Sequence, residues 1–338
     1  MRPTVLIQPI ALRKLTASVF EHHGVSKEDA KIVSDVLVEA NLRGHDSHGV
    51  VRVPKWIEGI KAGAINPACQ PSLITNFGAI GVLDGDRGLG PVVANRSIML
   101  AMEKARSFGL GAISVCNSAH IGMLAWYAEK LANARFIGLV TTNTEPGVAP
   151  HGAVDKLLGT NPLALACPTR DRPIVLDMST SVVARGKIVL AQRAKKSIPE
   201  GWAIDASGQA TTDPTEALNG ALLPVGGPKG SGLSVFVDIL SGALSGSEVG
   251  KGVAGTMNMS NRSTKGDFFL AINPGVFVGD DKFTQKVEDL RTQIRAARPA
   301  KGFDKVMVPG DFEHEEKARR TKEIVIDEVL FREIDSLA

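Results

Sequence analysis

The segment that organises the rest of this chain reads Arg43-Gly-His-Asp-Ser-His-Gly-Val-Val-Arg52. The 338 residues include seven histidines, so two within four positions concentrate groups that transfer protons near neutral pH. Arg52 adds a planar fork of N–H donors that matches the two oxygens of a substrate carboxylate. The same residues also suit a polar helix end, in which Asp46 or Ser47 caps a helix and the histidines are solvated. The local sequence leaves both interpretations open.

Helical patterns flank this segment on both sides. Apolar residues recur at helical spacing up to Gly24, which ends the first pattern. Ser26 has the features of a helix cap, and a second helical pattern continues from it to the segment. A third helix follows with Pro54 in its first turn. Residues 43–52 are therefore expected to form a junction between two helices, where a polar loop can face a cleft.

The middle of the chain has a different pattern, in which short apolar runs alternate with helices. The runs lie at 79–83, 112–116, 137–141, 174–176 and 268–272. The predicted helices between them lie at 91–108, 121–134 and 232–244. This alternation predicts an α/β (α+β) core.

The chain becomes charged and helical again after residue 274. We expect the two helical ends to pack together and to enclose an inserted domain. The predicted division is a discontinuous helical domain of residues 1–75 plus 280–338, which holds the segment 43–52 and the dimer contacts. The inserted mixed-sheet domain is then residues 76–279.

Composition excludes several classes of function. The net charge of +3 and the 22% of charged residues are ordinary for a globular protein and argue against a nucleic acid or an anionic membrane as partner. We also expect no membrane span and no secretory signal, because no apolar stretch has the required length. An odd number of cysteines without metal-ligand spacing indicates reduced thiols, a cytoplasmic protein and no metal site. These cysteines are Cys69, Cys116 and Cys167.

Residues 85–90 read Gly85-Asp-Arg-Gly-Leu-Gly90 and precede a predicted helix, as the dinucleotide-binding fingerprint does. The third glycine of that fingerprint is missing. Pro91 also removes a backbone N–H that would otherwise bind a phosphate. A glycine-rich turn into a helix is therefore the preferred interpretation, without a Rossmann role.

His120 follows a predicted strand that ends at Cys116. With a helix beginning near Ser118 or Ala119, His120 would lie in the first turn. The positive end of the helix dipole would then lower its pKa and leave a neutral imidazole able to accept a proton near pH 7. A capping or packing histidine at this junction is the alternative.

Lys229 is predicted in the first turn of a helix, where a cation is unfavourable unless it binds a phosphate or a carboxylate. Surface solvation explains an exposed lysine equally well. Asp177 follows the predicted strand at 174–176, and residues 309–313 form a turn into an acidic helix start. Each of these signals is weak by itself.

Taken together, the fragments resemble the type-2 malate/L-lactate dehydrogenase family. That family is also called sulfolactate dehydrogenase-like, and it includes ureidoglycolate dehydrogenase and 2,3-diketogulonate reductase. Six fragments carry the resemblance in chain order, across nearly the whole chain. They are residues 43–52, Asn117-Ser-Ala-His-Ile-Gly122, Gly159-Thr-Asn-Pro-Leu-Ala164, Asp177-Met-Ser-Thr-Ser181 with Ala184-Arg-Gly-Lys187, Gly226-Gly-Pro-Lys-Gly230, and Val308-Pro-Gly-Asp311.

The resemblance implies a non-Rossmann mixed-sheet domain that binds NAD or NADP, and a homodimer with sites near the subunit interface. His48 matches a proton donor of the diketogulonate reductase branch, and His120 matches a proton acceptor of the ureidoglycolate branch. From the residues themselves we assign substrate contacts to Ser47, Arg52 and Trp56. Cofactor contacts are implied for Thr144, Asp177, Met178, Ser179, Lys229, Gly310, Asp311 and Phe312.

Two positions depart from the family pattern. Many members have Glu in place of Asp311, and some have Tyr in place of Trp56. Because Trp56 lies one helical turn after Arg52, this second departure bears on substrate choice. Arg185, which follows the cofactor motif, has the reach for the 2′-phosphate of NADP or belongs to a solvated helical turn.

The expected activity is reversible hydride transfer between NAD(P) and C2 of a small 2-hydroxy or 2-oxo acid, of the malate or L-lactate type. Arg52 would bind the carboxylate, and His48 or His120 would transfer the proton. Reduction of a cyclic imino acid, of the piperideine-2-carboxylate type, is the first alternative. A non-catalytic ligand-binding relative is the second.

Overall fold

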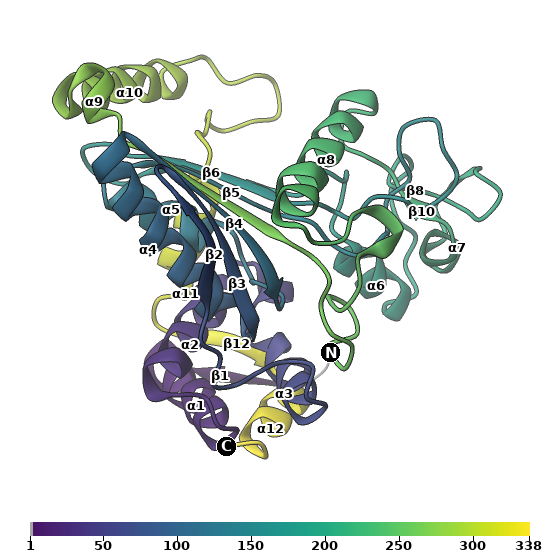
Figure 1. Cartoon of the computed structure of the whole chain (residues 1–338). Coiled ribbons are helices and arrows are strands. Elements are labelled where there is room, and N and C mark those ends of the chain that lie inside the picture. Colours follow the sequence, from purple (N-terminus) through teal and green to yellow (C-terminus); the bar gives the residue numbers. More distant parts are fainter. Residues whose placement is uncertain (1–2) are drawn as a thin grey trace.

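Both ends of the chain contribute to one helical layer of the computed structural model, which describes residues 3–338 (Figure 1). Its elements are β1 (Thr4–Ile7), α1 (Pro9–His22), α2 (Lys27–Leu42), α3 (Val53–Lys61), β12 (Ile324–Asp327) and α12 (Glu328–Asp335). β1 and β12 pair antiparallel, and helices α1, α2, α3 and α12 share one buried apolar core with them. The cap predicted for α2 is confirmed, because Ser26 Oγ accepts the backbone N–H of Asp29 at 3.2 Å.

A seven-stranded mixed sheet forms the centre of the molecule. Its spatial order is β2 (Ser72–Phe77), β3 (Ile80–Gly88), β4 (Leu110–Ser118), β11 (Asp267–Ile272), β5 (Ile137–Thr142), β6 (Leu163–Cys167) and β7 (Ile174–Met178). Only β3 and β4 are parallel neighbours among the described strands, and the other adjacent pairs are antiparallel. The prediction of a mixed α/β architecture is confirmed.

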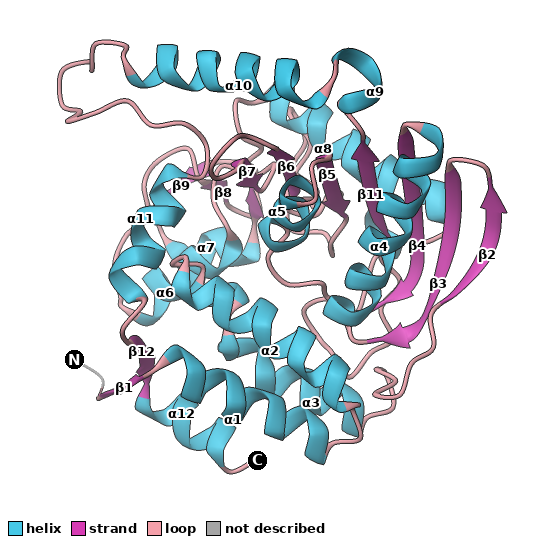
Figure 2. Ribbon diagram, turned by 90° about the vertical axis from the view of Figure 1, so that its left-hand side faces the viewer, coloured by secondary structure: helices cyan, strands magenta, loops and turns pink. Residues whose placement is uncertain are grey.

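Two helices, α4 (Gly90–Phe108) and α5 (Ala125–Asn133), cover one face of this sheet (Figure 2). Ile98 and Leu131 from the helices pack with Ile113 and Phe269 from the sheet, and all four side chains are fully buried. The opposite face carries α8 (Pro228–Ser241) across β4, β11 and β5. The side-chain hydroxyls of Thr141 and Ser241 join α8 to the sheet at 2.8 Å.

A third group of elements forms a small lobe beside α8. It comprises α6 (Arg185–Arg193), β8 (Ala203–Ile204), β9 (Ala210–Thr211), α7 (Pro214–Asn219) and β10 (Ala221–Leu222). The lobe has a small apolar core of its own. The remaining helices are α9 (Gly275–Val278), α10 (Asp280–Arg295) and α11 (Asp311–Arg320). Among residues 3–338 no helix has the length and hydropathy needed to cross a membrane.

All five predicted strands are present, but several element boundaries differ from the prediction. α8 begins at Pro228 rather than at residue 232, and α5 begins at Ala125 rather than at residue 121. The glycine-rich motif 85–90 lies within β3 and at the first residue of α4. The sequence did not predict β2, β6 or the β1–β12 pair.

Gly90 shows what this motif does. A Cβ at Gly90 would lie 2.2 Å from the carbonyl oxygen of His120 and 2.6 Å from that of Ala119. Since both neighbours are backbone atoms, they cannot rotate aside as a flexible side chain would. Gly90 therefore allows the segment that links β4 to α5 to pack directly on the start of α4.

Gly90→Ala is expected to lower the free energy of unfolding by about 1–3 kcal/mol, because the added methyl group overpacks this contact. Urea denaturation followed by circular dichroism measures the change. Gly232→Ala is the matched control, since no atom lies within 4 Å of a Cβ built there. Equal stability of the Gly90→Ala variant and the wild type would contradict the close contact.

Candidate active site

The segment 43–52 folds as two short 3-10 turns, η1 (Asp46–His48) and η2 (Val50–Arg52), between α2 and α3. The buried side chain of Asn41 joins them. Its amide nitrogen donates to Asp46 Oδ1 at 2.8 Å, and its oxygen accepts the Val50 N–H at 2.9 Å. A Cβ at Gly49 would lie 2.2 Å from the same oxygen, so the turn requires glycine. Sequence reasoning missed Asn41, whose only signal is a polar residue in a buried helical stripe.

Three polar residues of the segment make contacts that hold helices together. Arg43 bonds Glu39 at 2.8 Å and also bonds Glu129 on α5. Asp46 accepts from Arg320 of α11 at 3.0 Å, and His45 Nε2 lies 3.9 Å from Glu313 Oε1 of the same helix. These contacts fix the segment to α5 and α11. They leave Ser47, His48 and Arg52 for chemistry.

Arg52 is held by only one of its nitrogens. Its Nε donates to the carbonyl oxygen of Ser47 at 2.8 Å, while the Ser47 hydroxyl and His48 Nδ1 are 2.9 Å apart. Neither Nη1 nor Nη2 of Arg52 has a hydrogen-bond partner among residues 3–338. The fork that would bind a carboxylate is thus free, and burial lowers the pKa of this guanidinium.

The structure brings His120 to this segment. The rings of His48 and His120 have centroids 5.7 Å apart, with 30° between their planes. The ring centroid of Trp56 also lies near that of His120, at 6.2 Å. The side chain of Trp56, which is expected from the sequence to contact the substrate, is fully buried.

The predicted environment of His120 is wrong. Residues 119–124 are not helical and α5 starts at Ala125, so His120 is not in the first turn of a helix. Its pKa is nevertheless well below the usual value, because of burial first and then the positive charge of Arg52. Burial and Arg52 also lower the pKa of His48, to about 3. Both imidazoles are therefore neutral near pH 7.

The implied cofactor positions meet at one end of the sheet. Thr144 Oγ1 accepts the N–H of Thr160 at 3.0 Å, and the carbonyl oxygen of Thr160 accepts the N–H of Thr180 at 2.9 Å. The carbonyl oxygen of Thr180 in turn accepts the N–H of Val225 at 2.9 Å, just before the turn that carries Lys229. This chain of bonds connects the segments that carry Thr144, residues 177–179 and Lys229.

The implied cofactor positions near residue 310 are connected to these segments through β7, where Val175 N donates to the carbonyl oxygen of Pro309 at 3.2 Å. Asp311 accepts from Arg172 at 2.9 Å, from Arg295 at 2.5 Å and from the N–H of Val308 at 3.0 Å. Its carboxylate is thus engaged within the protein. Gly310 and the exposed Phe312 are its neighbours at the start of α11.

Asp177 and Lys229 differ in their surroundings. Asp177 Oδ2 accepts the N–H of Ala125, the first residue of α5, at 2.7 Å. Its pKa is raised, chiefly because the carboxylate is removed from water. Lys229 is exposed and is the second residue of α8, which begins directly after Gly226 and Gly227. Those glycines have φ values of 61° and 60°, which other residues rarely adopt.

A family model described as malate/L-lactate dehydrogenase matches residues 7–335. The malate/(S)-sulfolactate dehydrogenase of Methanothermus fervidus is 39% identical over 335 residues, which are 99% of this chain and 97% of that protein.

Two solved structures have the same fold. The sulfolactate dehydrogenase of Methanocaldococcus jannaschii superposes with a TM-score of 0.95 and 43% identity, covering 98% of this chain and 96% of that one. The delta1-piperideine-2-carboxylate reductase of Pseudomonas syringae superposes with a TM-score of 0.89 and 29% identity, covering 99% and 100%.

The lowered pKa of His48 predicts a pH-dependent stability. Between about 3 and the usual value of 6.5 the unfolded chain binds a proton that the folded site excludes, so stability falls as pH decreases through this window. In His48→Gln the free energy of unfolding should fall less steeply with decreasing pH, by up to about 1.4 kcal/mol per pH unit. Thermal unfolding at pH 8 and pH 5 measures the effect, with the exposed His22→Gln as control. An identical pH dependence in wild type and His48→Gln would contradict the neutral, buried imidazole.

Proposed function

This chain belongs to the malate/L-lactate dehydrogenase family and is a 2-hydroxyacid dehydrogenase, and we propose that it acts on a small acid of the malate or L-lactate type. The observation that carries the proposal is the free guanidinium fork of Arg52 beside two neutral histidines. The fork binds the substrate carboxylate in two hydrogen bonds, which fixes C2 and its oxygen next to the imidazoles.

The two histidines handle the proton of the substrate hydroxyl. One of His48 and His120 takes the hydroxyl proton during oxidation, and the other hydrogen-bonds the oxygen. Ser47 orients His48 through its hydroxyl, 2.9 Å away. Trp56 acts through His120, because its fully buried ring lies next to that imidazole, with 6.2 Å between the ring centroids.

The family implies a nicotinamide cofactor, which takes up or supplies the hydride when bound. The implied cofactor residues at the end of the sheet suit a nicotinamide cofactor. Lys229 suits its phosphates, because its side chain is exposed and the preceding Gly226 and Gly227 allow close backbone approach. Asp177, Met178, Ser179 and Thr144 supply further contacts, together with Phe312 and the backbone of Gly310 and Asp311.

The choice between NAD and NADP turns on Arg185. This exposed residue lies at the first position of α6, and its guanidinium Nη1 lies 2.6 Å from Met257 Sδ. We propose it as the group that would meet a 2′-phosphate. Comparing turnover of Arg185→Ala with both cofactors tests this assignment.

We propose the domain division expected from the sequence, with a non-Rossmann cofactor domain at residues 76–279 and a helical domain at 1–75 plus 280–338. The β1–β12 pair and the five antiparallel strand contacts support it. α10 is an exception within the helical part, because Arg291 and Glu288 bond the turn between β6 and β7. The three unpaired cysteines support a reducing, cytoplasmic location.

A cyclic imino-acid reductase is the second candidate, favoured by the 29% identical piperideine-2-carboxylate reductase. It requires a proton for nitrogen or carbon, where the dehydrogenase removes one from a hydroxyl. Turnover of malate, L-lactate, sulfolactate and a cyclic imino acid with NAD(H) and NADP(H) separates the two. The named dehydrogenases among the relatives disfavour the non-catalytic alternative.

The surface of the chain supports a homodimer. Its 16,160 Å² of accessible surface is roughly 2,900 Å² more than the ~13,300 Å² expected for a monomer of 35.7 kDa. Obligate dimers bury areas of this size. The excess includes an apolar face on α8, where Leu233, Phe236 and Ile239 are between 46% and 66% exposed.

The sheet beside α8 presents a matching surface. One cross-strand row of apolar side chains on the face opposite α4 and α5 is exposed or half-buried from β3 to β7. By register this row is Ile80, Ala112, Leu270, Leu139, Leu165 and Leu176. We propose that α8 and this row form the contact with a second copy of the chain.

Arg52→Ala is expected to raise KM for a 2-oxo acid roughly 30- to 150-fold, because two charge-assisted hydrogen bonds to the carboxylate are lost. Arg52→Lys should recover only part of this loss, since an ammonium cannot form the fork. Initial-rate kinetics measure both variants, with Arg96→Ala, exposed on α4, as control. A wild-type KM in Arg52→Ala would remove Arg52 from the substrate site.

Phe236→Glu is expected to convert the dimer into monomers, because a buried carboxylate at the contact is strongly unfavourable. Size-exclusion chromatography with light scattering measures the mass. Val329→Glu is the matched control, since this residue on α12 is similarly exposed at 68%. A wild-type protein that is monomeric, or a Phe236→Glu variant that stays dimeric, would contradict the proposed contact.

A further inference from the structure

The two histidines of the site differ in their ring nitrogens. The N–H of Gly122 donates to His120 Nδ1 at 3.0 Å. A nitrogen that accepts a hydrogen bond carries no proton, so the proton of the neutral ring lies on Nε2. His120 therefore presents an N–H donor, and no free lone pair, at Nε2.

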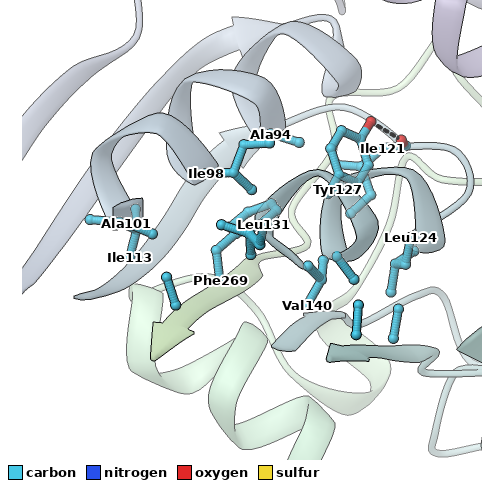
Figure 3. Close-up of a cluster of buried hydrophobic side chains, with 14 of the residues drawn as sticks. Ala94, Ile98, Ala101, Ile113, Ile121, Leu124, Tyr127, Leu131, Val140 and Phe269 are labelled. Atoms are coloured by element: carbon cyan, nitrogen blue, oxygen red, sulfur yellow. Dashed lines mark hydrogen bonds between the residues drawn. The ribbon is translucent and has the colours of Figure 1, made fainter. Parts of the chain in front are cut away.

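The backbone around His120 holds this arrangement in place. The fully buried hydroxyl of Tyr127 donates to the carbonyl oxygen of Ile121, as Figure 3 shows. Tyr127 is itself packed edge-on against Phe269, with ring centroids 6.2 Å apart. On the other side, Gly90 contacts the His120 carbonyl. Gly122 thus stays where its N–H meets the imidazole.

His48 has no such restriction. Its Nδ1 faces the Ser47 hydroxyl at 2.9 Å, and a hydroxyl both donates and accepts. His48 can therefore be protonated at Nδ1, at Nε2 or at both while Ser47 rotates to match. Protonation of His120 at Nδ1 would instead place two N–H groups against each other.

The groups around the two rings also lower the pKa of each imidazole. Burial comes first in lowering the pKa of His120, and the cations Arg52, Lys265 and Lys55 add to it, as His48 does when it is protonated. For His48 the contributions after burial come from Arg52 and then His45. Of these, Lys265 is paired with Asp267 at 2.6 Å. A substrate carboxylate on Arg52 would offset its charge at both rings.

We propose that His120 is a fixed Nε2–H donor to the substrate oxygen and that His48 alone carries the proton, with Gly122 and Tyr127 as positioning residues. The inference rests on the proposed function. In oxidation the substrate O–H bond breaks, an N–H bond forms at His48 Nε2, and the O–H electron pair forms the C2=O bond. The hydride leaves C2 with its electron pair for the oxidised nicotinamide. Reduction reverses each transfer.

Glutamine variants separate the two roles, because the amide N–H of glutamine replaces an Nε2–H donor but cannot carry a proton. His120→Gln should keep kcat within roughly 10- to 100-fold of wild type. His48→Gln should lose roughly 10³-fold or more and lose the pH dependence of kcat/KM. Equal loss in both variants, or greater loss in His120→Gln, would overturn the assignment.

The tautomer has a readout that needs no activity. In ¹⁵N NMR of the histidine-labelled wild-type chain, with His120→Gln as the assignment control, His120 Nδ1 should be unprotonated and Nε2 protonated. A protonated Nδ1 would refute the fixed donor even where the enzyme is active. Failure of the proposed function is a separate result, in which the wild type turns over none of the 2-hydroxy acids tested.

Tyr127→Phe tests the positioning residue, because it removes one hydroxyl and keeps the ring packing. We expect kcat to fall several-fold at an unchanged KM, with a mixed His120 tautomer in the NMR spectrum. A purely structural role predicts lower thermal stability with kcat and tautomer unchanged. That outcome would remove Tyr127 from the proposal.

Discussion

The two hydrogen bonds of the Asn41 side chain determine where the segment 43–52 lies. One bond holds the first 3-10 turn through Asp46, and the other holds the second through the Val50 N–H. Arg320 from the C-terminal part binds both the Asn41 carbonyl and the Asp46 carboxylate. Residues 43–52 are therefore held in place by α2 and α11, which come from opposite ends of the chain.

The electrostatic state of the site follows from this construction. Arg52 is partly buried with an unneutralised charge, and it acts on two imidazoles that are themselves removed from water. Arg52 therefore places a positive charge beside both imidazoles. An anion bound to Arg52 would offset this charge and raise the pKa of both rings.

Patterns of local origin were predictable from the sequence. Helical spacing located α1 and α2, the Ser26 cap located the start of α2, and apolar runs located five strands. β2 was missed because it is an edge strand with mostly exposed side chains, which leaves no continuous apolar run. β1 and β12 were missed because each is four residues long and is stabilised by a partner from the other end of the chain.

The sequence alone could not show which chemical groups the fold brings together. His48, Arg52 and His120 are each recognisable as chemical groups, whereas their approach depends on the fold. The low pKa of His120 was expected from a helix dipole, yet Gly90 and Tyr127 hold that residue in a non-helical segment and burial lowers the pKa instead. Asn41 was missed, because its hydrogen-bond partners become neighbours only when both turns form.

The β1–β12 pair gives the molecule a mechanical weak point. Thr4 lies opposite Asp327, so the two strands reach the chain ends at the same side of the ladder. A force that pulls the termini apart would break the hydrogen bonds of this pair one after another, starting at Thr4 and Asp327. The force would not be shared by all of the bonds at once. The helical layer, which includes the helices on either side of residues 43–52, would then separate before the central sheet.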